Sequence, residues 1–289
     1  MSAARALRIK HVSRNVAELA RAVAFYRDAL HFVLLEETRH DHPGSGSLVA
    51  RMRLGEQELC LVAFDSHGFP YPSRHSAADP WFQHLAIVVA DMPTAYAQLC
   101  RYAFEPISEG GPQTLPPGAG SVTAFKFRDP DGHPLELIQF PAGDTRWQRE
   151  GGLFLGIDHT ALVVTDLPRS LTFYEQLGFR VVSRSHNHGP AQQRLDGLAN
   201  ADVEVTKLAA VSNELPRLEL LCYRAHAGKA VAMAPDDMAA DRTVLEVEAG
   251  EPALVRDPTG HRLVLQPARH ADTSPTTASP TLDHPMRIV

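Results

Sequence analysis

An internal repeat constrains the fold of this chain more than any other feature. Residues 7–26, LRIKHVSRNVAELARAVAFY, align without a gap to residues 155–174, LGIDHTALVVTDLPRSLTFY, at an offset of 148 residues, as from His11 to His159. A second pair of segments, RDPDGHPLEL and RDPTGHRLVL, repeats at an offset of 128 residues, as from Asp129 to Asp257. Such self-similarity indicates that the chain is built from copies of one supersecondary unit.

Each half of the chain repeats again within itself. Residues 82–99, FQHLAIVVADMPTAYAQL, have the same order of features as residues 155–174: a His, an apolar run, an Asp, then a stretch of helical spacing. The chain therefore divides into four modules, at residues 7–65, 81–141, 153–224 and 228–268. The fourth module is short and has lost most of its helical stretch.

The modules predict two domains of two modules each, at residues 1–141 and 153–268, joined by a polar linker at 142–152. This agrees with the two domains expected for 289 residues. The tail at 269–289 is rich in Pro, Thr and Ser, and that composition predicts disorder.

The third module shows the local structure of the unit most clearly. Residues 158–164 form an apolar, β-branched run typical of a strand. Asp166 follows as a helix cap, with Pro168 in the first turn, where a missing N–H is tolerated. Apolar residues then recur at helical spacing until Gly178, a helix stop. The unit is predicted as a strand, a helix and a group of strands.

Composition excludes several classes of function. The formal charge of −6, without a basic block, is unfavourable for nucleic-acid binding, because neutralising phosphates requires clustered Lys and Arg. No stretch approaches eighteen apolar residues, so no membrane span is expected. The N-terminus lacks an apolar signal core, and the three cysteines lie far apart, which favours the reducing cytoplasm.

The repeated segments resemble one known family. A strand with His near its start, a helix ending in Phe-Tyr, a DPDGH turn and the strand LELIQF resemble the vicinal oxygen chelate superfamily. That superfamily includes glyoxalases, bleomycin- and fosfomycin-resistance proteins, epimerases and extradiol dioxygenases. The resemblance extends to about Gln266 and implies an α+β fold, in which four βαβββ modules pair into curved mixed sheets around a cleft.

The resemblance also implies where metal ligands lie: early on the first strand and on the last strand of each module. The first-strand positions hold His11, His84, His159 and Thr243. The last-strand positions hold Cys60, Glu136, Glu219 and Val264. The fourth module has therefore lost both ligands, which departs from the family pattern.

Two ways of pairing the modules predict different sites. Pairing in chain order brings together His11, His84 and Glu136, a two-His, one-carboxylate set suited to Fe²⁺ and oxygen activation. Pairing the middle modules with each other, and the outer modules with each other, gives a second set: His84, Glu136, His159 and Glu219. That set suits Zn²⁺, Ni²⁺, Co²⁺ or Mn²⁺ as a Lewis acid.

The middle pairing is favoured because it gathers both Glu residues at ligand positions into one site. It leaves His11 unexplained. A structural alternative is that Glu136 and Glu219 form the solvent-facing half of an alternating strand pattern. His133 and His261 each follow the Gly of a turn, where a backbone hydrogen bond explains them better than metal ligation.

These observations predict an enzyme that needs one divalent metal ion (Fe²⁺, Mn²⁺, Ni²⁺, Co²⁺ or Zn²⁺) and acts on a small molecule that chelates it through neighbouring oxygens. The favoured reaction is proton transfer of the glyoxalase or isomerase type, with Glu136 or Glu219 as the base. The alternatives are an Fe²⁺-dependent ring-cleaving dioxygenase and a metal-free resistance protein that sequesters its ligand. The segments at 109–120 and 183–196 are expected to be loops at the rim of the cleft. Monomer and homodimer both remain open.

Overall fold

The computed structural model describes residues 5–41, 46–66, 68–72, 75–142, 144–147, 152–224, 228 and 232–268. The tail at 269–289 that the sequence predicts to be disordered lies outside the described residues, as do residues 143 and 148–151 of the predicted linker. The fold is α+β, with two sheets and few helices, as the sequence predicts.

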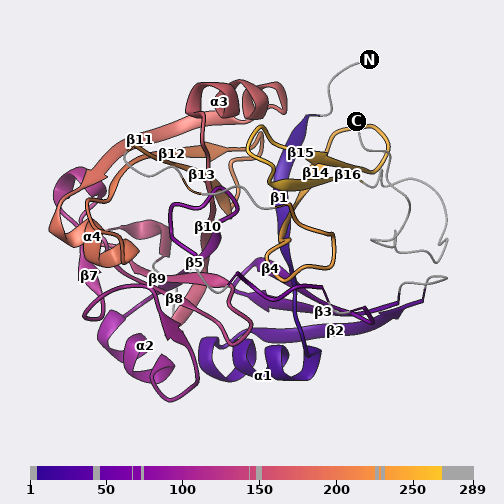
Figure 1. Cartoon of the computed structure of the whole chain (residues 1–289), viewed down its shortest axis with the longest axis horizontal. Coiled ribbons are helices and arrows are strands. Elements are labelled where there is room, and N and C mark those ends of the chain that lie inside the picture. The colour runs from indigo at the N-terminus through magenta and orange to yellow at the C-terminus, as the bar shows by residue number, and fades with distance from the viewer. Residues whose placement is uncertain are drawn as a thin grey trace.

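The first and fourth modules together form one sheet, which we call the outer sheet (Figure 1). Its strands are β1 (Ala6–Asn15), β2 (Val33–His40), β3 (Ser47–Leu54), β4 (Gln57–Phe64), β14 (Arg242–Val247), β15 (Ala253–Arg256) and β16 (Arg262–Pro267). Their order is β15-β16-β14-β1-β4-β3-β2, and β1 pairs antiparallel with β14. The two ends of the described chain thus lie side by side in one sheet.

The second and third modules form the other sheet, the middle sheet. Its strands are β5 (Gln83–Val89), β6 (Glu105–Pro106), β7 (Gln113–Thr114), β8 (Thr123–Arg128), β9 (Pro134–Gln139), β10 (Phe154–Val163), β11 (Arg180–His188), β12 (Asp202–Ala209) and β13 (Arg217–Tyr223). Their order is β11-β12-β13-β10-β5-β9-β8-β6, with β7 paired to β8. Since β5 and β10 are antiparallel neighbours, the modules pair middle with middle and outer with outer, and the chain-order pairing is wrong.

The helices are α1 (Leu19–Leu30), α2 (Met92–Leu99), α3 (Leu167–Gln176) and α4 (Pro190–Asp196), with short 3₁₀ turns η1 (Pro117–Ala119) and η2 (Thr145–Trp147). Asp166 caps α3 by accepting a hydrogen bond from the Arg169 N–H, and Gly178 follows that helix with a φ of 88°. Both features agree with the sequence prediction. Residues 232–268 of the fourth module contain no helix, and no described helix is long and apolar enough to cross a membrane.

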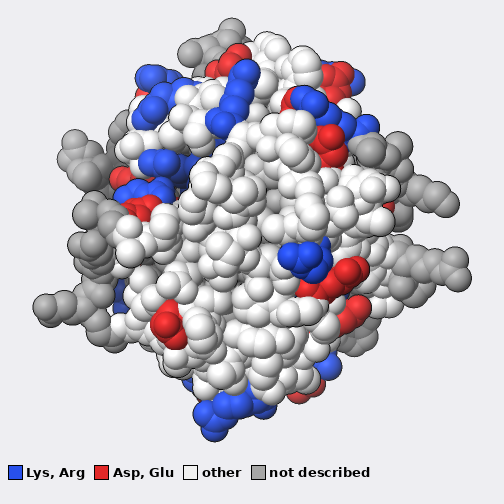
Figure 2. Space-filling model, turned by 90° about the vertical axis from the view of Figure 1, so that its left-hand side faces the viewer, with Lys and Arg blue, Asp and Glu red and all other residues white. Residues whose placement is uncertain are grey.

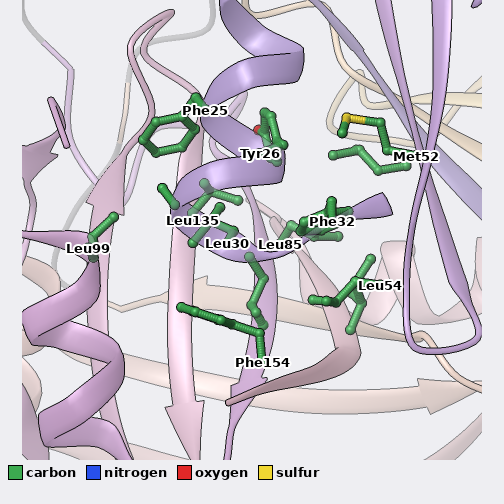
Figure 3. Close-up of a cluster of buried hydrophobic side chains, with 14 of the residues drawn as sticks. Phe25, Tyr26, Leu30, Phe32, Met52, Leu54, Leu85, Leu99, Leu135 and Phe154 are labelled. Carbon is green, nitrogen blue, oxygen red and sulfur yellow. The ribbon is translucent and has the colours of Figure 1, made fainter. Parts of the chain in front are cut away.

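The largest core joins the two sheets. Figure 3 shows Tyr26 and Leu30 of α1 among side chains of the middle sheet, including Leu85, Leu135 and Phe154. Burial of each large apolar side chain contributes about 1.5–3 kcal/mol. The shared core therefore fixes the position of the middle sheet relative to the rest of the molecule.

An equivalent Tyr–Asp hydrogen bond joins the two modules within each half of the chain. Tyr26 is fully buried, and its hydroxyl donates to Asp129 Oδ2 of the DPDGH turn at 2.8 Å. Tyr174 makes the equivalent bond to Asp257 Oδ2 at 3.1 Å. His133 Nε2 lies 2.6 Å from a backbone carbonyl oxygen, and His261 Nε2 lies 2.7 Å from one. This confirms the structural interpretation of both histidines.

Candidate metal centre

Four side chains predicted as ligands lie on one face of the middle sheet. In the register of its strands, Ala161 of β10 lies between His84 on β5 and Glu219 on β13. In the same way, Ala86 of β5 lies between His159 on β10 and Glu136 on β9. Directly paired residues in adjacent strands face the same side of a sheet, and faces alternate along a strand. The antiparallel pairing of β5 with β10 therefore assembles the whole set.

The ligand atoms of this set are spaced as they would be around one ion. Glu136 Oε2 lies 3.0 Å from His84 Nε2 and 3.6 Å from His159 Nε2, and Glu219 Oε2 lies 3.3 Å from His159 Nε2. Two donor atoms bound to one ion at about 2.1 Å lie about 3–3.5 Å apart in tetrahedral or octahedral geometry. The distances of 3.0 and 3.3 Å lie in that range, and the third, 3.6 Å, lies just above it.

The buried nitrogens of the site lack hydrogen-bond partners. The Nε2 atoms of His84 and His159 are inaccessible to solvent, and neither makes a hydrogen bond of acceptable geometry, although carboxylate oxygens lie beside them. Buried polar atoms in folded proteins are nearly always satisfied, so an exception needs an explanation. The ligand atoms of His84, Glu136 and His159 lie within 4.8 Å of one another, and Glu219 forms a second such group with His159 and Asp158. Imidazoles and carboxylates gathered in this way form a donor set suited to a divalent ion. The residues present therefore fit the metal that the sequence predicts.

Both carboxyl groups are held in the charged form that metal binding requires. Burial raises the pKa of Glu136, but its contacts with His159 and His84 outweigh burial and bring that pKa well below its usual range. Burial likewise opposes the charge of Glu219, but His159 and Lys207 lower its pKa. Two negative charges, on the buried Glu136 and the partly buried Glu219, thus lie beside His159.

The two imidazoles differ in charge. Burial lowers the pKa of His84, and the nearby Lys126 lowers it further, so this ring is neutral. Burial also opposes the charge of His159, but Glu219 and a hydrogen bond to Asp158 outweigh it and raise the pKa of His159 to about 9. That bond, 2.9 Å from Nδ1 to Asp158 Oδ2, turns Nε2 toward the carboxylates, as the second partner of a metal-binding histidine usually does.

Two lysines flank the site, Lys126 buried and Lys207 partly buried, and sequence reasoning missed both. Lys126 on β8 pairs directly with Glu136, and Lys207 on β12 pairs directly with Glu219. Lys207 Nζ lies 2.9 Å from Glu219 Oε1 and 3.0 Å from Asp158 Oδ2. The only sequence signal for these lysines is a charge inside an apolar strand, which reveals nothing about its partner until the strand register is known.

The four predicted ligands open into a cavity of about 460 Å³. The predicted rim segments do line it, through residues 117–120 and parts of 183–195, but the second segment is the strand β11 followed by the helix α4. Gln192 of α4 lines the cavity. Gln113 accepts a hydrogen bond from Arg194 at 2.7 Å. The cavity is large enough for a small-molecule ligand.

The alternative ligand set of His11, His84 and Glu136 is not assembled. His11 belongs to the outer sheet, and among the described residues no group of three candidate ligands includes it. Burial, with Lys10 and Arg51 nearby, lowers the pKa of His11 to about 3. His11 is therefore a buried neutral imidazole in a different sheet from Glu136 and Glu219.

The remaining ligand positions of the outer sheet hold no metal-binding pair among the residues that the structure describes. Cys60 is buried, which raises the pKa of its thiol to about 12. On β14 the position that matches His84 is Arg242, not Thr243 as the sequence predicts, because Arg242 pairs with β1 where His84 pairs with β10. Thr243 faces the opposite side, where its hydroxyl accepts a hydrogen bond from Gln83 at 3.2 Å.

The surface on the side of α4 carries charges of both signs. Figure 2 shows this side, with Lys and Arg interspersed with Asp and Glu around a broad uncharged area. A phosphate backbone binds to clustered positive charge. This face therefore offers no extended basic surface of that kind among its described residues.

Comparison with known proteins identifies a matching family. The model of the Glyoxalase/Bleomycin resistance protein/Dioxygenase superfamily matches residues 8–137 and 156–265. The lactoylglutathione lyase of Neisseria meningitidis is 28% identical over 138 residues, which cover 48% of this chain and 94% of that protein. About half of this chain thus matches almost the whole of that relative. This agrees with the internal repeat, in which each half of the chain is one copy of a unit of that length.

Solved structures share the fold over most of the chain. A glyoxalase I mutant from Zea mays superimposes with a TM-score of 0.60 at 19% identity, covering 92% of this chain and 94% of that one. A dioxygenase candidate from Bacillus subtilis superimposes with a TM-score of 0.55 at 11% identity, covering 91% and 86%. Similarity at these identities establishes the fold and leaves the reaction to be argued from the site.

Proposed function

Because this chain belongs to the Glyoxalase/Bleomycin resistance protein/Dioxygenase superfamily, we propose that it is a divalent-metal-dependent enzyme that transfers a proton within a small substrate, as a glyoxalase or isomerase does. Family membership alone does not select a reaction, because one fold supports several chemistries. The observation that carries the proposal is the set of two imidazoles and two carboxylates at the cavity wall: His84, Glu136, His159 and Glu219.

These four residues would hold the ion. A divalent ion there would supply Lewis acidity toward the carbonyl of a substrate that carries two neighbouring oxygens. Two carboxylates would balance the charge of the ion, and a set of two imidazoles and two carboxylates is typical of Zn²⁺, Ni²⁺, Co²⁺ or Mn²⁺. Burial of His84, Glu136 and His159 limits the access of bulk water to the reacting atoms.

In this proposal a carboxylate transfers the proton. Glu136 and Glu219 both reach the cavity, and either is placed to take a proton from a carbon beside the carbonyl and return it to the neighbouring carbon. The lactoyl group of lactoylglutathione, named by the Neisseria relative, carries oxygens on neighbouring carbons. S-lactoylglutathione is therefore the first probe for this chain.

Deuterium exchange into this probe tests the proposal even if the natural substrate is a different molecule. Metal-loaded protein is incubated with S-lactoylglutathione in D₂O, and loss of the lactoyl C–H signal is followed by NMR. We expect exchange in the wild type, none after chelation of the metal, and at least about a hundredfold loss in Glu136→Gln with metal retained. Undiminished exchange in both Glu136→Gln and Glu219→Gln would sink the proposal.

A second candidate function is Fe²⁺-dependent oxygen chemistry. His84, His159 and Glu136 have ligand atoms within 4.8 Å of one another, a two-His, one-carboxylate set. An oxygen electrode with Fe²⁺-loaded protein and catechol distinguishes the two functions. Oxygen consumption that disappears in His159→Ala supports the dioxygenase, whereas deuterium exchange without oxygen uptake supports proton transfer.

A further inference from the structure

The two glutamates of the site are held differently, although the repeat makes their positions equivalent. Glu219 divides its oxygens between two partners: Oε1 lies 2.9 Å from Lys207 Nζ, and Oε2 lies 3.3 Å from His159 Nε2. One oxygen is thus fixed by an ammonium group while the other lies beside the candidate ligand His159. Charge-assisted contacts of this kind are among the strongest that orient a carboxylate.

Glu136 lacks the corresponding anchor. Its contacts with both imidazoles, at 3.0 and 3.6 Å, fall on the same oxygen, Oε2. No lysine or arginine in the described part of the chain lies within ion-pair distance of this carboxylate. The second oxygen, Oε1, is therefore not tied to a cation, in a side chain that lines the cavity.

The reason for the asymmetry is the partner of the other lysine. Lys126 is the counterpart of Lys207, but its ammonium lies 2.7 Å from Asp196 Oδ1 at the end of α4. Asp196 also accepts hydrogen bonds from Gln192 at 2.7 Å and Tyr223 at 3.0 Å, so it is held firmly in place. Lys126 thus pairs with Asp196 of α4 and not with Glu136, whereas Lys207 pairs with Glu219.

Resting on the function proposed above, we propose that Lys207 is a positioning residue that makes Glu219 a permanent metal ligand, and that Glu136 is the carboxylate that exchanges the proton with the substrate. Glu136 Oε1 takes the proton from the carbon while the C–H electron pair moves toward the substrate carbonyl oxygen. The same carboxyl group then returns the proton to the neighbouring carbon, so no further reactant is needed.

Metal affinity tests the role of Lys207 independently of turnover. Zn²⁺ binding to the full chain is measured by competition with a chromophoric chelator for wild type, Lys207→Met and the matched control Lys126→Met. Loss of a group that orients a ligand costs about 10–100-fold in metal affinity. We expect that loss in Lys207→Met and a smaller loss in Lys126→Met, because the Lys126 ammonium pairs with Asp196 and not with a candidate ligand. Equal effects of the two substitutions would overturn the role of Lys207.

The isosteric pair Glu136→Gln and Glu219→Gln provides a second test that does not depend on the folding of the lysine variants. We expect Glu219→Gln to weaken Zn²⁺ binding at least about tenfold more than Glu136→Gln does. At saturating metal, deuterium exchange into S-lactoylglutathione is expected to fall further in Glu136→Gln. The reverse order in either measurement contradicts the assignment.

Failure of this inference is distinguishable from failure of the proposed function. Wild type that binds Zn²⁺ and exchanges the proton, with the order of the two glutamates reversed, refutes only the division of roles. Wild type that binds Zn²⁺ but exchanges no proton refutes the proposed reaction, and the affinity measurements still decide the role of Lys207. Wild type that binds no Zn²⁺ refutes both.

Discussion

Metal binding to this protein is expected to release a proton, and its affinity is therefore expected to depend steeply on pH. In the metal-free protein, Glu219 and Asp158 outweigh burial and raise the pKa of His159 to about 9, so the ring is positively charged at neutral pH. An ion that binds Nε2 must displace that proton. His84, whose pKa is lowered by burial, has no proton to lose in the same range.

The magnitude follows from the pKa. Well below pH 9 the apparent metal affinity falls about tenfold for each pH unit. Because about half of the His159 rings are already protonated at pH 9, the total loss between pH 9 and pH 7 is about 50-fold. The metal affinity decreases as the pH falls, because a raised histidine pKa favours the protonated ring, and the proton competes with the metal for Nε2. Calorimetric titration with Zn²⁺ in buffers of different ionisation enthalpy is expected to show about one proton released per ion at about pH 7.5.

Asp158→Asn provides the control for this prediction. Without the carboxylate that accepts from His159 Nδ1, the pKa of His159 falls, and the pH dependence of metal affinity moves to lower pH. A metal affinity that stays constant between pH 9 and pH 7, with no proton released, would refute the reasoning, since it would mean that His159 is already neutral before the ion binds.

Three further predictions concern stability, each measured by urea unfolding. Lys126→Met leaves Asp196 as a buried charge without its cation and is expected to destabilise the protein by about 3–5 kcal/mol, with much of the loss recovered when Asp196→Asn is added. Tyr174→Phe removes the hydrogen bond to Asp257 and is expected to cost about 1.5–3 kcal/mol; no change would show that the bond is not formed in solution. Leu85→Ala opens a cavity in the core shared by the two sheets and is expected to cost about 2–5 kcal/mol, and a smaller loss would argue against that core.

The sequence predicts the modules and the His and Glu residues of the candidate site. Repetition of one pattern indicates the unit, and the resemblance to the vicinal oxygen chelate superfamily implies the ligand positions within it. The pairing of the modules followed from one further argument: both Glu residues at ligand positions, Glu136 and Glu219, then fall into one site. The structure confirms that pairing through the antiparallel contact of β5 with β10.

Features that depend on register between distant strands were not predictable. The choice of Thr243 instead of Arg242 was wrong by one residue, because the fourth module lacks the helix that aligns the other three. Lys126 and Lys207 become meaningful only once β8 is set beside β9 and β12 beside β13. Helix α4 lies in a segment of seven residues that is too short for a periodic signal.

The metal content of the purified protein tests the central claim most directly. After loading with a divalent ion and removal of the excess, elemental analysis is expected to find about one ion per chain in wild type and in His11→Ala. The double variant His84→Ala/His159→Ala is expected to retain none. Absence of bound metal in wild type, retention in the double variant, or loss in His11→Ala would each contradict a metal centre on the middle sheet.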